Sequence, residues 1–231
     1  RILGFVKPGV WEYEIEAEFS HEFLRNRSKG WAYTPIVASG KNACVLHYIE
    51  NNMQCLDGDV ILLDVGAEYA NYSSDMSRSI PVNGRFTPRQ KEVYNAVLRV
   101  KSQAEKMLVP GTMLAEYQKE VGRMMESELL GLKLLDQTDI KNQDPNWPAY
   151  KKYFMHGTSH YLGLDTHDVG LWNVPIEANM VFTCEPGIYI PEEGLGIRIE
   201  DNLVVQASGE PFNLMRNIPI TVEEIESLMN S

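Results

Sequence analysis

Apolar residues recur at helical spacing in two stretches of the chain, each introduced by a Pro-Gly pair. The first follows Pro8-Gly9 and places Ile15, Phe19 and Phe23 on one face with glutamates between them, which predicts an amphipathic helix of about four turns. The second follows Pro110-Gly111, and its apolar face consists of Leu114, Tyr117, Val121, Met124 and Met125. The repeated design indicates that the chain is built from two similar units.

Two further helices are marked by capping residues at their start. Thr87-Pro88-Arg89-Gln90 combines an N-cap threonine, a proline at the first helical position and a glutamine that completes a capping box. We expect this helix to run to about Val109. Thr221 and Glu224 form a second capping box and predict a short C-terminal helix.

The remaining ordered segments have the apolar or alternating pattern of strands. They cover residues 60–65, 68–80, 179–185 and 196–205. Each pair of strands follows one of the Pro-Gly helices, so we expect two related halves, roughly 1–110 and 111–231, each a helix followed by a strand hairpin. Residues 135–150 are polar, contain two prolines and are expected to form a long excursion between the halves.

Composition narrows the class of protein. A chain of 231 residues with 44% hydrophobic and 23% charged residues can form one globular domain. The net charge of −11 disfavours nucleic acid or an anionic membrane as a partner, and no apolar run reaches the ~20 residues of a membrane-spanning helix. Three scattered cysteines give no disulfide framework, which favours a reducing compartment, and we expect a cytoplasmic protein.

Two aspartates stand out in the first half. Asp64 lies near the end of an otherwise apolar strand, where an unpaired carboxylate would cost several kcal/mol. Asp75 follows eleven residues later, where period-two alternation places it on the same face as Ser77. A hairpin would bring the two aspartates side by side.

The second half repeats this arrangement with two glutamates. Glu185 ends the apolar strand 180–185 and is followed by Pro186-Gly187, and Glu200 shares a strand face with Arg198. Four carboxylates in one core would repel one another, and a pair of divalent cations would neutralise them. Alone, Asp64 or Glu185 could be a strand-end carboxylate that caps backbone groups, and Arg198 could be a simple cross-strand partner of Glu200.

Three of the five histidines, His156, His160 and His167, lie within twelve residues. The first two are four residues apart, but Gly157 replaces the glutamate of the HExxH zinc signature. One imidazole among carboxylates suits manganese, cobalt or zinc better than magnesium or calcium. Each histidine could instead be a satisfied structural imidazole.

The motifs together resemble those of aminopeptidase P and its relative prolidase, the pita-bread metallopeptidases. The resemblance spans nearly the whole chain, in order, through the segments Leu46-His47-Tyr48, 63–69, 74–78, 154–168, 184–189 and 196–201. It implies an α+β pita-bread fold in which two pseudo-symmetric halves pack helices on a curved antiparallel sheet. Cys184 departs from the family's more usual aliphatic residue.

The resemblance implies a ligand set for two divalent ions, with manganese expected and cobalt or zinc as alternatives. The five ligands would be Asp64, Asp75, His160, Glu185 and Glu200, with Asp75 and Glu200 bridging the ions. Glu185 would also shuttle a proton. By the same analogy, His167 and His156 would line the site and steady the tetrahedral intermediate. His47 would lie beside the substrate proline, and Arg198 would hold the rim through Tyr189. His47, His156 and Tyr189 would be the substrate-binding residues.

The activity implied is hydrolysis of the bond before a proline in the second position of a peptide. A prolidase restricted to dipeptides and a non-catalytic pita-bread domain that binds peptides or proteins are the alternatives. We expect residues 1–231 to form a single catalytic domain, the C-terminal part of a longer chain. Homo-oligomerisation is left open.

Overall fold

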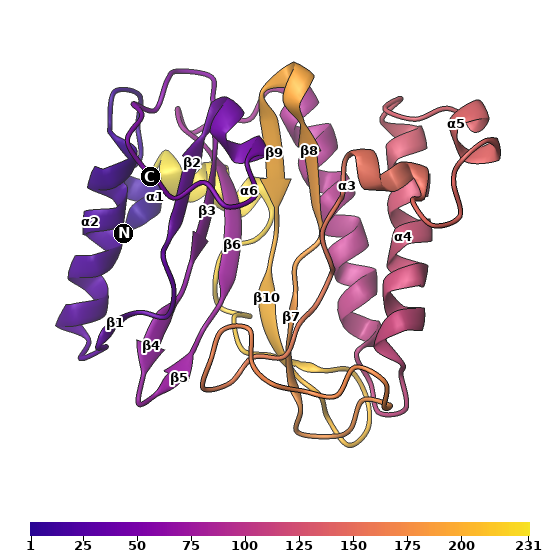
Figure 1. Ribbon diagram of the computed structural model, residues 1–231. Coiled ribbons are helices and arrows are strands. Elements are labelled where there is room, and N and C mark those ends of the chain that lie inside the picture. The colour runs from indigo at the N-terminus through magenta and orange to yellow at the C-terminus, as the bar shows by residue number, and fades with distance from the viewer.

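The computed structural model describes all 231 residues, and its first half consists of two helices followed by antiparallel strands. Helix α2 (Glu12–Arg25) lies beside strand β2 (Ile36–Ser39), which pairs with β3 (Val60–Val65), and β3 in turn pairs with β6 (Met76–Pro81) (Figure 1). The smaller elements are α1 (Ile2–Phe5), β1 (Gly30–Trp31), a 3₁₀ turn (Gly40–Cys44), β4 (Ala67–Tyr69) and β5 (Tyr72–Ser73). Strands β1, β4 and β5 form a separate small sheet.

The second half repeats the order of helices and then strands. Helices α3 (Pro88–Ala104) and α4 (Leu114–Gly131) pack together, and α3 also contacts β8 (Gly187–Ile190) and β9 (Leu195–Arg198). This half begins at α3 rather than near the expected boundary at residue 110, because α3 packs on α4 and on strands of the second half. Strand β7 (Val181–Cys184) pairs with β10 (Asp201–Val204), and β8 pairs with β9. The remaining elements are α5 (Gln137–Lys141), β11 (Phe212–Asn213), α6 (Val222–Met229) and 3₁₀ turns at Glu105–Met107, Ala149–Lys152 and Pro191–Glu193.

The two halves meet between β6 and the β9–β10 segment. Backbone N–H of Glu200 donates to the carbonyl of Ser77 at 3.0 Å, and the Arg198 N–H donates to Ser79 Oγ at 3.1 Å. The strands of both halves therefore lie next to one another as a curved layer, with the long helices beside it (Figure 1).

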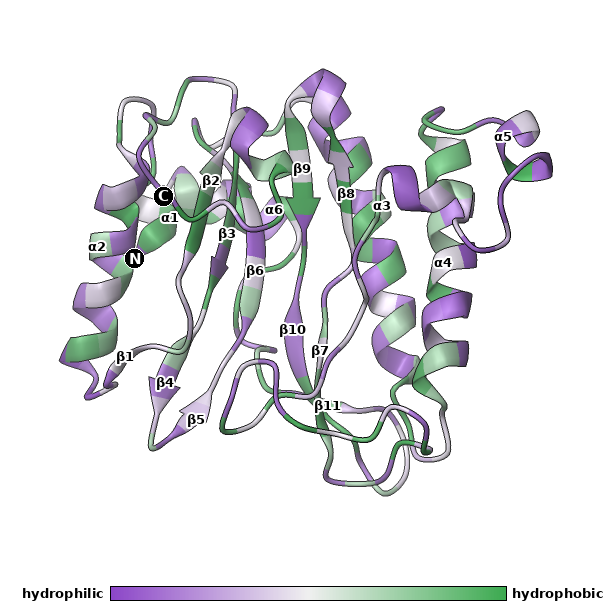
Figure 2. Ribbon diagram, in the orientation of Figure 1, coloured by the Kyte–Doolittle hydropathy of each residue, from purple (hydrophilic) through white to green (hydrophobic).

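Hydrophobic side chains fill the space between the helices and the strands. Helices α2 and α4 alternate hydrophobic and hydrophilic positions along their length, as Figure 2 shows. A cluster of 40 buried residues forms the main core, and its largest fully buried members include Tyr94, Tyr117, Phe154 and Phe182. The packed layer fixes the strands that carry the candidate chemistry.

The predicted helices are confirmed, with one boundary corrected. Thr87 caps α3 through a capping box with Gln90, and Thr221 caps α6 in the same way with Glu224. Helix α3 ends at Ala104 and continues as a 3₁₀ turn, so the expected end near Val109 was too late.

The predicted strand 60–65 is confirmed as β3, whereas the other three predicted strands were right in place but too long. The expected strand 68–80 is broken into β4, β5 and β6, because the chain reverses at Ala70-Asn71, where both residues have positive φ. Residues 196–205 divide into β9 and β10, and the expected excursion 135–150 contains helix α5. No helix in the chain combines the length and the apolar character needed to cross a bilayer.

Gly66 follows β3, which carries Asp64, and allows the close approach of the segment that carries Asp75. A Cβ at this position would lie 1.8 Å from the carbonyl oxygen of Ser74. We expect Gly66→Ala to lower the free energy of unfolding by several kcal/mol, since backbone must move to relieve the overlap.

Urea denaturation measures this effect. The control is Gly131→Ala at the end of α4, where an added Cβ meets nothing within 4 Å and should leave stability equal or slightly higher. Equal midpoints for the two variants would contradict the proposed close approach.

Candidate metal centre

A cavity of about 570 Å³ opens where the two halves meet. All five carboxylate and histidine side chains expected to bind metal line this cavity, and so do His47, His156, His167 and Arg198. The size is typical of a site for a small ligand or a short peptide. Residues as far apart in the sequence as His47 and Glu200 are therefore brought to one place by the pairing of the strands.

The first half contributes Asp64 from β3 and Asp75 from the residue just before β6. The hydroxyl of Tyr33 lies 2.5 Å from Asp64 Oδ1 and 2.7 Å from Asp75 Oδ1, so it links the two carboxylates. The backbone N–H of Asp75 donates to Asn202 Oδ1, and the Asn202 amide donates back to the Asp75 carbonyl. Asp75 is thereby held from both sides of the junction between the halves.

The second half contributes Glu185 and Glu200, which lie opposite each other. Cys184 pairs with Asp201, and Gly187 pairs with Arg198. The strand register is therefore the same before and after Glu185-Pro186, where the pairing of the strands is interrupted. Pro186 lacks an N–H and so cannot complete the ladder there. The two glutamates thus stand across from one another on one face of the β7–β8 and β9–β10 pair.

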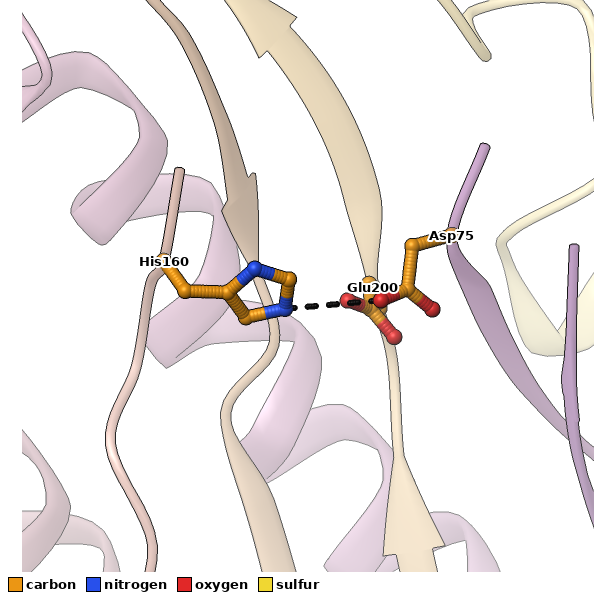
Figure 3. A group of neighbouring side chains, drawn as sticks. All are labelled: Asp75, His160 and Glu200. Carbon is orange, nitrogen blue, oxygen red and sulfur yellow. Dashed lines mark ion pairs between the residues drawn. The ribbon is translucent and has the colours of Figure 1, made fainter. Parts of the chain in front are cut away.

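His160 lies at the centre of this carboxylate cluster. Its Nε2 is 3.4 Å from Asp75 Oδ2 and 3.5 Å from Glu185 Oε1. Its Nδ1 is 2.9 Å from the carbonyl of Tyr161, which makes Nδ1 a donor and turns Nε2 toward the carboxylates. Burial lowers the pKa of His160, but the hydrogen bond to Asp75 and the charge of Glu185 outweigh it, so the pKa is raised. Figure 3 shows His160, Asp75 and Glu200 converging on one point, and their ligand atoms lie within 4.8 Å of one another.

The cluster contains more carboxylates than the neighbouring cationic side chains can neutralise. Arg198 donates to Asp64 Oδ2 at 2.5 Å and is the only lysine or arginine side chain that lines the cavity. Burial raises the pKa of Glu185 to about 7, although His160 and Arg198 act in the opposite direction. Burial, together with repulsion from Asp75, raises the pKa of Glu200 well above its usual value.

Glu200 shows most directly that the cluster fits a cation. Its Oε2 accepts from Ser77 Oγ at 2.7 Å, but its Oε1 is buried and has no hydrogen-bond partner. A buried carboxylate oxygen without a partner is costly, and a divalent ion would satisfy it. Four carboxylates and one neutral imidazole are a suitable donor set for such an ion.

His156 is held from behind the cavity by a chain of hydrogen bonds. Arg198 donates to the hydroxyl of Tyr189 at 2.8 Å, and that oxygen lies 2.7 Å from His156 Nε2. Burial, assisted by Arg198, lowers the pKa of His156 to about 3, so the ring is neutral near pH 7. Its Nδ1 is then the N–H that donates to the Gly157 carbonyl at 2.8 Å.

Tyr189 does not line the cavity, contrary to its expected place beside the substrate. The side chain is fully buried in strand β8 and reaches the site only through His156 and Arg198. Its position supports a role in holding those two side chains.

His47 and His167 lie at the exposed part of the cavity. The ring centroids of His167 and His160 are 4.4 Å apart in an edge-to-face arrangement. Burial and the neighbouring His160 lower the pKa of His167. A neutral His167 has one N–H available to a ligand in the cavity.

Tyr33 and Trp172 also line the cavity, although no motif in the sequence indicated them. Tyr33 lies between β1 and β2 in a segment without periodicity, and Trp172 lies in an irregular loop. Neither belongs to an acidic or histidine-rich motif. Only the three-dimensional arrangement shows that they reach the site.

A buried ion network supports Glu200 from the opposite side of the strands. Arg78 donates to the carbonyl of Glu200 at 2.6 Å and to Asp201 Oδ1 at 2.6 Å, and Lys101 from α3 pairs with the other oxygen of Asp201. Because all three charged side chains are buried, removal of one would leave another uncompensated.

Comparisons with known proteins point to one family. The family model of metallopeptidase family M24 matches residues 1–207. The chain is 43% identical to Xaa-Pro aminopeptidase of Escherichia coli (strain K12) over 99% of this chain and 54% of that protein. It is 39% identical to human Xaa-Pro aminopeptidase 3 over 96% of this chain and 45% of that protein.

Solved structures give the same result. Zinc-substituted E. coli aminopeptidase P in complex with product has a TM-score of 0.92 at 41% identity, covering 100% of this chain and 54% of that chain. Proline aminopeptidase P II from Yersinia pestis has a TM-score of 0.92 at 40% identity, covering 100% and 55%. The fold is therefore the expected α+β pita-bread fold, and the chain spans about half the length of these relatives.

The raised pKa of Glu185 has a consequence for stability without metal. A carboxyl group whose pKa is raised on folding contributes stability below its unfolded value, here 4.5, and that contribution is lost as the pH rises through about 7. Glu185→Gln removes the charge. In chelator-treated protein at pH 8 we expect the variant to be more stable than the original by on the order of 2 kcal/mol, and the difference to shrink strongly at pH 5.

Urea denaturation at the two pH values measures this difference. Glu177→Gln, which removes an exposed carboxylate, serves as the control and should differ little at either pH. A Glu185→Gln variant that is less stable at pH 8 would contradict the electrostatic description of the cluster.

Proposed function

Because the chain belongs to metallopeptidase family M24, we propose that it is a metal-dependent exopeptidase that releases the N-terminal residue from peptides with proline in the second position. The observation that carries this proposal is the convergence of four carboxylates and His160 on one cavity. Its similarity to two Xaa-Pro aminopeptidases supports the choice of substrate.

We propose two divalent ions, manganese in preference to cobalt or zinc, held by Asp64, Asp75, His160, Glu185 and Glu200. Asp75 and Glu200 are suited to bridge the ions, since the junction between the halves brings one carboxylate from each half together. When bound, such ions polarise a carbonyl and lower the pKa of water, so that hydroxide is available near neutral pH.

The protein's own groups would then handle the protons and position the substrate. Glu185 is placed to accept a proton from the attacking water and to pass it to the departing proline nitrogen. The N–H of His167 would donate to the oxygen of the scissile carbonyl as negative charge develops there. His156 would help to hold that intermediate, kept in place by Tyr189 and Arg198.

A proline after the scissile bond explains why a dedicated cavity is needed. Proline has no backbone N–H, so an enzyme cannot grip the substrate at that position by a backbone hydrogen bond. The exposed His47, beside apolar Leu46 and Ile49, provides a surface on which the ring can pack. We therefore assign the proline to this part of the cavity.

The cavity favours longer peptides over the dipeptides of a prolidase. A dipeptide presents a free carboxylate directly after the proline, and a lysine or arginine would be expected to bind it. Arg198 is the only such residue in the lining, and it is already bound to Asp64, Tyr189 and Ser77. A non-catalytic binding domain is disfavoured because all five candidate ligands are present.

We place the protein in the cytoplasm. Its three cysteines, Cys44, Cys55 and Cys184, are all free thiols, as is typical of a reducing compartment.

Loss of one bridging carboxylate should abolish hydrolysis without unfolding the chain. We expect Asp75→Asn and Glu200→Gln to lower kcat/KM on an Ala-Pro peptide by roughly two orders of magnitude or more, because each removes a charge needed to hold the ions. Glu223→Gln on the exposed face of α6 is the control. A folded Asp75→Asn variant with near-original activity would refute the proposed centre.

Substrate choice provides a second test. We expect the manganese-loaded protein to cleave Ala-Pro-Ala-Ala and to leave Ala-Ala-Ala-Ala and N-acetylated Ala-Pro-Ala-Ala nearly untouched, as judged by chromatography of the products. Equal turnover of all three peptides would contradict an Xaa-Pro exopeptidase.

A further inference from the structure

Trp172 is an aromatic side chain at the open part of the cavity with no role in the chemistry proposed above. Asp75, Arg198 and Glu200 line the cavity at exposures of 6%, 4% and 1%, whereas Trp172 lines it at 54%. The cavity therefore runs from a buried acidic end to an exposed part that includes this indole.

The loop that carries Trp172 is firmly anchored. The Trp172 ring packs edge-to-face on Tyr161 with centroids 5.7 Å apart, and the hydroxyl of Tyr161 donates to the carbonyl of Leu171 at 2.8 Å. Gly170 lies so close to the Tyr161 ring that an added Cβ would be 2.3 Å from it.

Asp168 stabilises the beginning of the same loop by hydrogen bonds to its backbone. Its carboxylate accepts from the N–H groups of Leu164 at 2.9 Å and Val169 at 2.8 Å. The loop is also tied to the first half of the molecule, since the Ser73 N–H donates to the Gly163 carbonyl at 2.8 Å. An exposed indole on a loop held in this way is preorganised, which lowers the entropic cost of binding a ligand.

The direction of the substrate follows from the proposed function, on which this inference rests. The scissile bond must lie at the acidic cluster, and an exopeptidase accommodates only one residue before it. The rest of the peptide must therefore leave through the exposed part of the cavity. The first residue able to place a side chain there after the proline is the third.

We propose that Trp172 forms the subsite for the third residue of the substrate and selects large aromatic side chains at that position. An aromatic ring can bury apolar surface on the indole and stack with it in a favourable geometry, whereas glycine can do neither. The neighbouring Leu171 is also exposed but does not line the cavity, so it provides a matched control on the same loop.

The test compares Ala-Pro-Phe-Ala with Ala-Pro-Gly-Ala in the manganese-loaded protein. We expect kcat/KM to favour the phenylalanine peptide by about three- to tenfold, Trp172→Ala to reduce this ratio to about one, and Trp172→Phe to keep most of it. Leu171→Ala should leave the ratio unchanged.

Two results would overturn the subsite. One is equal cleavage of the two peptides by the original protein. The other is a Trp172→Ala variant that keeps the original ratio, including one that loses activity on both peptides equally, as a purely structural role would require. If the original protein cleaves neither peptide, the proposed function fails. In that case, calorimetry can measure the affinity of both peptides for the original protein and for Trp172→Ala. These affinities show whether Trp172 discriminates between the two peptides.

Discussion

The structure depends on one electrostatic constraint, the clustering of two buried and two half-buried carboxylates around a single imidazole. Arg198 is the one permanent cation among them, and it is engaged with Asp64. Burial, reinforced by repulsion between the carboxylates, raises the pKa values of Asp64, Glu185 and Glu200. Their ionised forms therefore oppose folding near neutral pH, and bound cations would relieve this cost. The unpartnered oxygen of Glu200 is the clearest local sign of this requirement.

The scaffold keeps the charges together by several independent means. The strand register places Glu185 opposite Glu200, and Gly66 lets β3 approach the chain before Asp75. Tyr33 links the two aspartates, while Arg78 holds the backbone of Glu200 from the other side. Each half of the molecule supplies two carboxylates, and so the site exists only where the halves meet.

Much of this arrangement could be predicted from the sequence, because the candidate metal ligands depart from the pattern of the residues around them. Asp64 and Glu185 interrupt apolar strands, which made them conspicuous, and the helices were marked by capping residues such as Thr87 and Thr221. Strands β2 and β8 were missed, since β2 is short and β8 follows Pro186-Gly187, a pair usually found in turns. Tyr33 and Trp172 were missed because their roles depend on contacts between distant segments. The place of Tyr189 behind His156 could not be predicted for the same reason, since only the packing shows that its side chain is buried.

We propose that two divalent cations complete the carboxylate cluster, and calorimetric titration of manganese into chelator-treated protein at pH 8 measures their number. We expect saturation at two ions per chain. We also expect proton release that grows as the pH is lowered toward the raised pKa values of Glu185 and Glu200. Absence of specific binding of manganese, cobalt and zinc alike, or saturation at fewer than two ions per chain, would contradict this proposal.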